Sequence, residues 1–212
     1  MYEPLLSPSV FEEEFRAFAR QEEAHPSAPG ALVFYGSSSI RFWLTLAKDF
    51  PETRVINRGF GGSTLAECVR ELERLVVPLQ PRAVVLYAGE NDIDQGATPE
   101  QLLATFETFL SRLEAHLGPV PVVVISVKPS PARFSQIDRI RRANALLRAA
   151  VEQRPHVHFL DVFESMLETP ENVRHELFTS DCLHMSRAGY VLWRDSLRPF
   201  LSARGLLGAC RA

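Results

Sequence analysis

Short runs of consecutive apolar residues recur along the chain and alternate with segments whose apolar residues are spaced three and four apart. The runs have the length of β-strands and are apolar throughout, which is typical of strands buried on both faces of a sheet. The spaced segments have the period of amphipathic helices. The predicted strands are 32–35, 55–57, 83–88, 121–127 and 158–162.

Helical patterns precede the first run and follow every run. The predicted helices span 8–24, a short stretch ending near 49, 64–76, 98–117, a long basic stretch ending near 153, and a last helix that starts at Ser186. Thr64 with Glu67, and Thr98 with Gln101, have the spacing of capping boxes. A proline at the first helical position supports the second of these starts.

This alternation of strand and helix predicts an α/β fold. We expect a three-layer α/β/α sandwich with a central five-stranded parallel sheet, because strands that are apolar on both faces need a helix layer on each side. No linker or internal repeat divides the chain, so residues 1–212 are predicted to form one domain. In such a fold the functional loops lie at the carboxyl ends of the strands.

Composition narrows the class of protein. Apolar residues make up 46% of the 212 and the formal net charge is −3, which gives no electrostatic reason to expect nucleic-acid binding. No apolar run approaches the ~20 residues of a membrane span, and Met1–Ser7 lacks the pattern of a secretory signal. The scattered Cys68, Cys182 and Cys210 form no disulfide framework. We therefore expect a cytoplasmic location.

Polar and glycine-rich loops follow three of the predicted strands. They are 36–39, 59–63 and 89–92, and Asp181 and His184 stand three apart before the last helix. A serine in a strand-to-helix turn lies beside free backbone N–H groups, which suits a nucleophile whose oxyanion needs donors. Acyl transfer requires a nucleophile, a base, a carboxylate that orients the base, and oxyanion donors. The sequence offers a residue for each role.

Taken alone, each feature has an ordinary structural explanation. Small polar residues such as Ser37–Ser39 and Asn91–Asp92 are common in turns, and a glycine loop can exist for its positive φ alone. A single histidine such as His184 is most often a surface or capping residue. The joint occurrence of all four features favours catalysis.

In this arrangement the sequence resembles the SGNH hydrolases, also called the GDSL esterase/lipase family. The resemblance is closest to the small single-domain branch related to platelet-activating-factor acetylhydrolase subunits. The matching segments are FYGSSSI (34–40), NRGFGGST (57–64), GEND (89–92) and DCLH (181–184). They occur in the family's order and extend over most of the chain.

The resemblance implies the flavodoxin-like SGNH hydrolase fold and a catalytic triad. Ser38 would be the nucleophile, His184 the general base, and Asp181 the carboxylate that orients the imidazole. The oxyanion hole would consist of the backbone N–H groups of Ser38 and Gly62 and the side-chain amide of Asn91. The family needs neither cofactor nor metal.

One position departs from the family pattern. Ser37 stands where the family usually has the aspartate of Gly-Asp-Ser. The register of the nucleophile could therefore fall on Ser37 or Ser39. Ser38 is favoured because it is two residues after Gly36, as the family's serine is after its glycine.

Other residues give weaker indications of function or of burial. His156 and His158 alternate along a strand and could face one side like metal ligands, but no carboxylate or cysteine cluster accompanies them. Trp43 and Trp193 are expected in the core. Cys182 is expected to be a small buried residue between the acid and the base.

The sequence thus predicts a serine esterase, or acylhydrolase, that cleaves small ester substrates through an acyl-enzyme. Acetyl or short acyl esters of sugars or lipids are the expected substrate class. One alternative is an acyltransferase that uses the same site. Another is a non-catalytic, flavodoxin-like module that binds phosphate or flavin at the Gly36–Ser39 turn. The oligomeric state stays open, a homo-oligomer included.

Overall fold

The five predicted strands form one parallel sheet in the computed structural model, which describes residues 10–208. The strands are β1 (Leu32–Gly36), β2 (Val55–Gly59), β3 (Ala83–Tyr87), β4 (Val122–Ile125) and β5 (Val157–Leu160). Their order is β2-β1-β3-β4-β5, and every neighbouring pair is parallel. The predicted fold class is confirmed.

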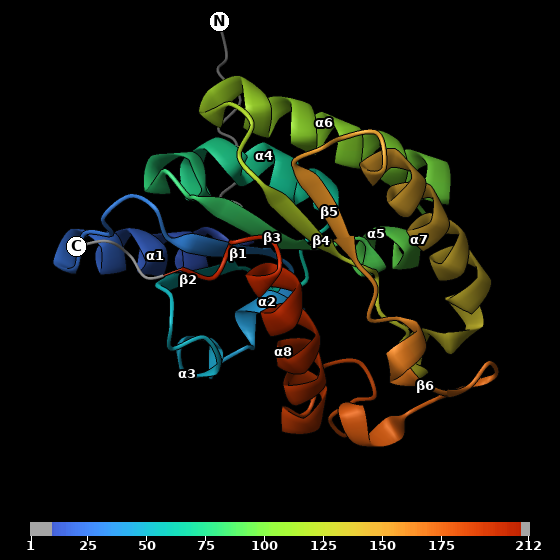
Figure 1. The fold of residues 1–212 in the computed structure, drawn as a ribbon. Coiled ribbons are helices and arrows are strands. Elements are labelled where there is room, and N and C mark those ends of the chain that lie inside the picture. The colour runs from blue at the N-terminus through green and yellow to red at the C-terminus, as the bar shows by residue number, and fades with distance from the viewer. Residues whose placement is uncertain (1–9, 209–212) are drawn as a thin grey trace, which may run out of the picture.

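Helices cover both faces of this sheet (Figure 1). On one face lie α1 (Glu12–Ala24), α4 (Leu65–Leu75), α6 (Pro99–Leu117) and α7 (Ile137–Val151). On the other lie α2 (Ser38–Arg41), α3 (Leu46–Asp49) and α8 (Arg187–Ser202). This distribution follows from right-handed crossovers: a connection leading toward β2 and one leading toward β5 fall on opposite faces.

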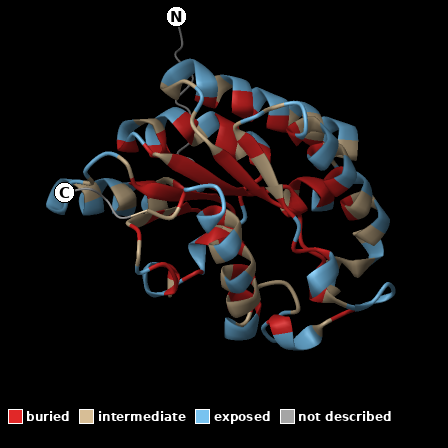
Figure 2. Ribbon diagram, viewed as in Figure 1, coloured by how far each residue is buried: buried red, intermediate tan, exposed pale blue. Residues whose placement is uncertain are grey.

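The sheet separates two hydrophobic cores. In β1 the side chains of Val33 and Tyr35 join the core under α1, α4, α6 and α7, whereas those of Leu32 and Phe34 join the core under α3 and α8. All five residues of β1 are buried, and so are all five of β3 (Figure 2). Burial on both faces is the physical reason for their uninterrupted apolar sequences.

Three of the predicted helix starts agree with the structure. Thr64 and Thr98 both form complete capping boxes with the residue three positions later. Ser186 is the N-cap of α8 and its hydroxyl accepts the backbone N–H of Gly189. Trp43 and Trp193 are core residues, as expected.

Several predicted boundaries were wrong. β2 continues to Gly59, because Asn57–Gly59 pair with Phe34–Gly36 of β1. The predicted loop 89–92 contains the start of α5 (Glu90–Asp94). The stretch that ends near 49 contains two short helices, α2 and α3, instead of one.

Further differences lie near the two ends. The helix predicted for 8–24 begins at Glu12, and residues 8 and 9 lie outside the described part of the chain. The basic helix begins only at Ile137, after a 3-10 turn at Pro131–Gln136. The loop-rich stretch before residue 181 holds a small hairpin of β6 (Leu167–Thr169) and β7 (Asn172–Val173), which was not predicted.

The remaining predictions from the sequence concern membrane spans and the cysteines. Within residues 10–208 no helix has the length and apolar character needed to cross a membrane. Cys68 is buried and Cys182 half-buried, and both are free thiols. The expectation that Cys182 is fully buried is wrong, since it lies in a surface turn with φ +59°. Cys210 and Met1–Ser7 lie outside the described residues.

Candidate active site

Two of the predicted site residues, Ser38 and Asn91, follow the neighbouring strands β1 and β3. From β1 the chain passes to β2 on one side, and it then crosses to β3 on the other side of β1. Ser38 is two residues after the end of β1, and Asn91 is four residues after the end of β3. Because the connections from this position diverge, a crevice opens at the carboxyl ends of the strands.

A tight turn at the end of β1 exposes one serine of the three. Gly36 has φ +138°, and a Cβ there would come 1.8 Å from the carbonyl oxygen of Tyr87. Only glycine permits so close an approach of the two strands. After this turn Ser37 and Ser39 are buried, at 4% and 2% exposed, whereas Ser38 is half-buried at the start of α2.

The structure brings Ser38, His184 and Asp181 together. His184 Nε2 lies 3.1 Å from Ser38 Oγ, although the two residues are 146 positions apart. His184 Nδ1 lies 2.6 Å from Asp181 Oδ2. Ser37 and Ser39 make no such contact with the imidazole, so the hydroxyl that faces it is the one favoured by the sequence.

Asp181 is held in its ionised form. Burial opposes ionisation, but hydrogen bonds from the His184 ring, the backbone N–H groups of Leu183 and His184, and the Thr179 hydroxyl outweigh it and keep the pKa of Asp181 well below its usual value. An ionised carboxylate can only accept hydrogen bonds. The proton of the neutral imidazole therefore lies on Nδ1, which leaves Nε2 free to accept the Ser38 proton.

A neighbouring ring limits the orientation of the imidazole. The Phe42 ring packs edge-on against His184, with centroids 4.9 Å apart and an interplanar angle of 88°. Phe42 is the C-cap of the one-turn helix that Ser38 begins. The same short segment thus carries the hydroxyl and supports the ring that faces it.

Three groups are available to donate hydrogen bonds into the same pocket. The backbone N–H groups of Ser38 and Gly62 have no acceptor among residues 10–208. Gly62 has φ +71°, a conformation that glycine adopts without strain. Asn91 Nδ2 donates to the Ser63 carbonyl at 2.9 Å, and its second hydrogen has no acceptor in this part of the chain.

The orientation of the Asn91 amide is determined by Arg133. Arg133 Nη1 lies 3.0 Å from Asn91 Oδ1. A guanidinium has no acceptor, so the atom that it contacts must be the amide oxygen. The NH2 group consequently points to the Ser63 carbonyl and the pocket.

These residues line an open pocket of about 460 Å³. Ser38, Gly62, Asn91 and His184 are among the lining residues, and so is Arg133. The arrangement can deprotonate a hydroxyl and stabilise negative charge formed beside it, which is the chemistry of acyl transfer.

Sequence reasoning missed a buried polar network directly behind Asn91. Glu90 is 5% exposed and contacts the ammonium of Lys128, the hydroxyl of Ser130 at 2.6 Å and the hydroxyl of Tyr87 at 3.0 Å. Arg133 Nη1 lies 3.7 Å from the same carboxylate. Burial lowers the pKa of Lys128, while the Glu90 carboxylate opposes that effect.

One signal could have drawn attention to this network. The segment 128–131 follows β4, so it had to lie at the same edge of the sheet as the other loops. Its backbone also reaches the histidine loop, because the Ala132 N–H donates to the Cys182 carbonyl at 3.0 Å. The loop after β4 therefore connects Asn91 with the Asp181–His184 turn.

Asp92, another residue of the sequence motifs, has a structural role. The Asp92 carboxylate accepts the backbone N–H of Leu65 at 2.9 Å and so holds the N-terminus of α4. His156 and His158 are not part of a metal-binding cluster: no group of three or more histidine, cysteine or acidic side chains suited to a metal occurs between residues 10 and 208.

Known proteins resemble this chain in sequence. The sequence matches the profile described as "GDSL-like Lipase/Acylhydrolase family" over residues 15–192. The platelet-activating factor acetylhydrolase IB subunit alpha1 from Bos taurus is 28% identical over 169 residues, which cover 76% of this chain and 70% of the bovine one. The subunit from Homo sapiens is 27% identical with the same coverage.

Solved structures show the same fold. A GDSL-like lipase from Bacteroides thetaiotaomicron superimposes with a TM-score of 0.77 at 20% identity, covering 90% of this chain and 98% of the other. A lipase/acylhydrolase from Enterococcus faecalis gives a TM-score of 0.71 at 19% identity, with 82% and 96% covered.

Proposed function

Since the chain belongs to the GDSL-like lipase/acylhydrolase family, we propose that it is a serine esterase that cleaves small esters through an acyl-enzyme intermediate. Ser38 is the nucleophile, His184 the general base and Asp181 the carboxylate that orients it. The observation that carries the proposal is the continuous chain of contacts from Ser38 Oγ through the imidazole to Asp181 Oδ2.

Acylation proceeds by attack of Ser38 Oγ on the ester carbonyl carbon. The hydroxyl proton passes to His184 Nε2, and the carbonyl oxygen becomes an oxyanion that accepts hydrogen bonds from Ser38 N–H, Gly62 N–H and Asn91 Nδ2. The tetrahedral intermediate then collapses. The bond to the alcohol oxygen breaks, the imidazolium returns its proton to that oxygen, and the acyl group stays on Ser38.

Deacylation repeats these steps with water. His184 takes a proton from water as the water oxygen attacks the acyl carbon, and Ser38 leaves with a proton returned from the imidazolium. Asp181 stabilises the imidazolium in both half-reactions without itself becoming protonated. Ser37 takes no part in these transfers, because its side chain is buried and the hydroxyl in contact with the imidazole is that of Ser38.

The test is hydrolysis of p-nitrophenyl acetate by the Ser38→Ala variant. We expect kcat to fall at least ~10³-fold, because the nucleophile is lost while the fold is unchanged. Ser37→Ala is the matched control and should keep activity within a few-fold. A fluorophosphonate probe should label Ser38 in the wild-type protein and no serine in Ser38→Ala. Undiminished turnover by Ser38→Ala would refute the proposal.

An alcohol could replace water in the second half-reaction. Product analysis in the presence of an added alcohol separates the two outcomes: free acid indicates a hydrolase, and a new ester indicates the acyltransferase alternative. Membership of a hydrolase family favours water as the acceptor of the acyl group. It also argues against the non-catalytic, phosphate- or flavin-binding alternative.

A further inference from the structure

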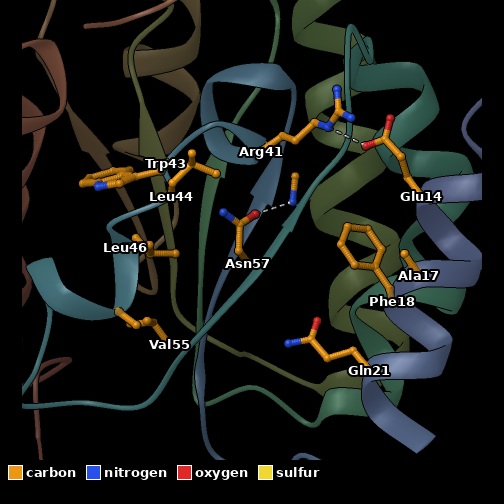
Figure 3. Close-up of a pocket in the computed structure, with 12 residues that line it drawn as sticks. Glu14, Ala17, Phe18, Gln21, Arg41, Trp43, Leu44, Leu46, Val55 and Asn57 are labelled. Carbon is orange, nitrogen blue, oxygen red and sulfur yellow. Dashed lines mark hydrogen bonds and ion pairs between the residues drawn. The ribbon is translucent and has the colours of Figure 1, made fainter. Parts of the chain in front are cut away.

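A second hollow of about 510 Å³ lies beside the catalytic pocket, across the outer edge of β2 (Figure 3). Figure 3 shows residues of α1 on one side of β2, and Trp43, Leu44 and Leu46 on the other. We call this hollow the β2 groove. Its lining combines apolar side chains, among them Phe18, Leu44 and Val55, with the polar side chains of Glu14, Gln21, Arg41 and Asn57.

The β2 groove adjoins the catalytic pocket. Glu14 and Arg41 line both. Arg41 is the last residue of the one-turn helix that begins with Ser38, and its Nε lies 3.0 Å from Glu14 Oε2. A molecule whose ester group lies at Ser38 would have to pass over this ion pair to reach the groove.

Exposed apolar side chains gather around these two hollows. Among residues 10–208 three large apolar side chains are exposed: Val10 at 88%, Phe42 at 40% and Leu44 at 89%. Val10 and Phe42 line the catalytic pocket, and Leu44 lines the groove. Single exposed apolar residues are common, but their concentration at one site indicates contact with an apolar partner or ligand.

The polar groups of the groove do not favour a charged ligand. Glu14 and Arg41 pair with each other, and Glu14 also accepts the Gly61 N–H at 3.2 Å. The Asn57 amide donates to the Ile40 carbonyl at 2.7 Å and accepts the Gly59 N–H at 2.9 Å. These charges and the amide already have partners inside the protein.

A docking β-strand fits the groove poorly as well. Pairing with the edge of β2 requires its outward backbone groups. The Gly59 N–H is already bonded to the Asn57 side chain, and the Asn57 carbonyl accepts Arg58 Nη1 at 3.2 Å. The edge is therefore blocked over part of its length.

We propose that the β2 groove binds the hydrocarbon chain of the ester substrate, so that this protein prefers esters with an extended acyl or alkyl chain. The inference rests on the proposed esterase function, since the chain must project from an ester held at Ser38. Each methylene group of the substrate that moves from water onto the apolar side chains of the groove raises the affinity for the substrate by up to about fourfold.

Two substrate series test this proposal and identify which side of the ester enters the groove. In the first, p-nitrophenyl esters lengthen from acetate to octanoate. In the second, acetate esters lengthen from ethyl to octyl alcohol. We expect kcat/KM to rise at least ~10-fold along one series and to change little along the other. The series that rises shows whether the acyl or the alcohol chain occupies the groove.

Two alanines on α1 provide a variant and its matched control. Ala17 is exposed and lines the groove, whereas Ala19 is exposed on the same helix and lines a different hollow. Ala17→Trp should abolish the gain with chain length and leave acetate hydrolysis within about twofold. Ala19→Trp should behave as wild type in both series.

The outcomes separate this inference from the esterase proposal. If hydrolysis depends on Ser38 but kcat/KM is flat or falls in both series, the groove does not bind the chain and the esterase proposal stands. A gain with chain length that survives Ala17→Trp likewise overturns the inference. Activity that persists in Ser38→Ala instead overturns the esterase proposal.

Discussion

The Asn91 side chain is oriented by a residue that belongs to none of the four sequence motifs. Arg133 holds the amide oxygen at 3.0 Å and is itself held by Asp94 Oδ2 at 2.9 Å. Its side chain is 14% exposed, so this pair is partly shielded from water. Because Arg133 acts through Asn91, we regard it as a positioning residue.

A double-mutant cycle tests this role. Asn91→Ala should lower kcat ~10²- to 10³-fold, the usual loss of one oxyanion donor. Arg133→Ala should lower kcat roughly tenfold with little change in KM, because the amide then loses one of the two hydrogen bonds that orient it. The double variant should be no worse than Asn91→Ala alone.

The control is Gln136→Ala. Gln136 donates to Asp94 Oδ1 at 2.8 Å but does not touch Asn91, so its loss should leave kcat within about twofold. Additive losses of kcat from Arg133→Ala and Asn91→Ala would show that Arg133 acts on catalysis independently of Asn91.

At the level of elements, the start of α4 sets the position of the preceding loop, which carries Gly62. Thr64 and Glu67 cap this helix reciprocally, at 3.2 and 2.8 Å, and Asp92 accepts the N–H of Leu65. Ser63, whose carbonyl holds Asn91, directly precedes the cap. The helix start therefore links the Gly62 loop to Asn91.

Two capping threonines allow this link to be tested. Thr64→Ala and Thr98→Ala each remove the hydroxyl of a capping box, so each should lower the free energy of unfolding by about 1 kcal/mol in urea titrations. Only Thr64→Ala should also lower kcat, by several-fold, since the Thr98 capping box makes no hydrogen bond to Ser63 or Asn91. Equal kcat values in the two variants would contradict the role assigned to the start of α4.

At the scale of the whole molecule, α8 brings the histidine loop to the serine turn. Arg187 forms two 2.7 Å hydrogen bonds to the Asp49 carboxylate of α3, and Trp43 Nε1 donates to the same group at 2.7 Å. The Tyr190 hydroxyl donates to the Ser39 carbonyl at 3.0 Å. The contacts of Arg187 and Tyr190 join residues 138 and 151 positions apart and hold His184 over Ser38.

We expect Asp49→Asn to reduce stability in a pH-dependent way. The Arg187 hydrogen bonds keep the pKa of the buried Asp49 well below its usual value despite burial. A carboxyl with a lowered native pKa stabilises the fold above its unfolded-state pKa of about 3.9, and this contribution is lost as the pH falls further.

The measurement is urea unfolding at several pH values. Arg187 is half exposed, so the loss at pH 7 should be about 1–3 kcal/mol and should shrink below about pH 4. Asp195→Asn, which removes an exposed partner of Arg194 on α8, should change stability by less than about 0.5 kcal/mol. If the loss of stability does not vary with pH, the charge of Asp49 is not its cause.

The amino-acid sequence by itself determined the features that depend on near neighbours. The apolar runs predicted the five strands, and the spacing of Thr64 with Glu67 predicted a helix start. The turn after Gly36 and the Asp181–His184 spacing also depend on residues within a few positions of each other. Such patterns are readable because propensity, periodicity and capping act over about one helical turn or one strand.

Only the tertiary structure decided the features that depend on distant residues. β2 extends to Gly59 because β1 offers partners there, and the predicted loop after Gly89 is helical. Arg133 reaches Asn91 from 42 positions away, and the β2 groove forms between elements that share no local pattern. These arrangements depend on which side chains packing brings within a few ångströms, and separation along the chain does not specify that distance.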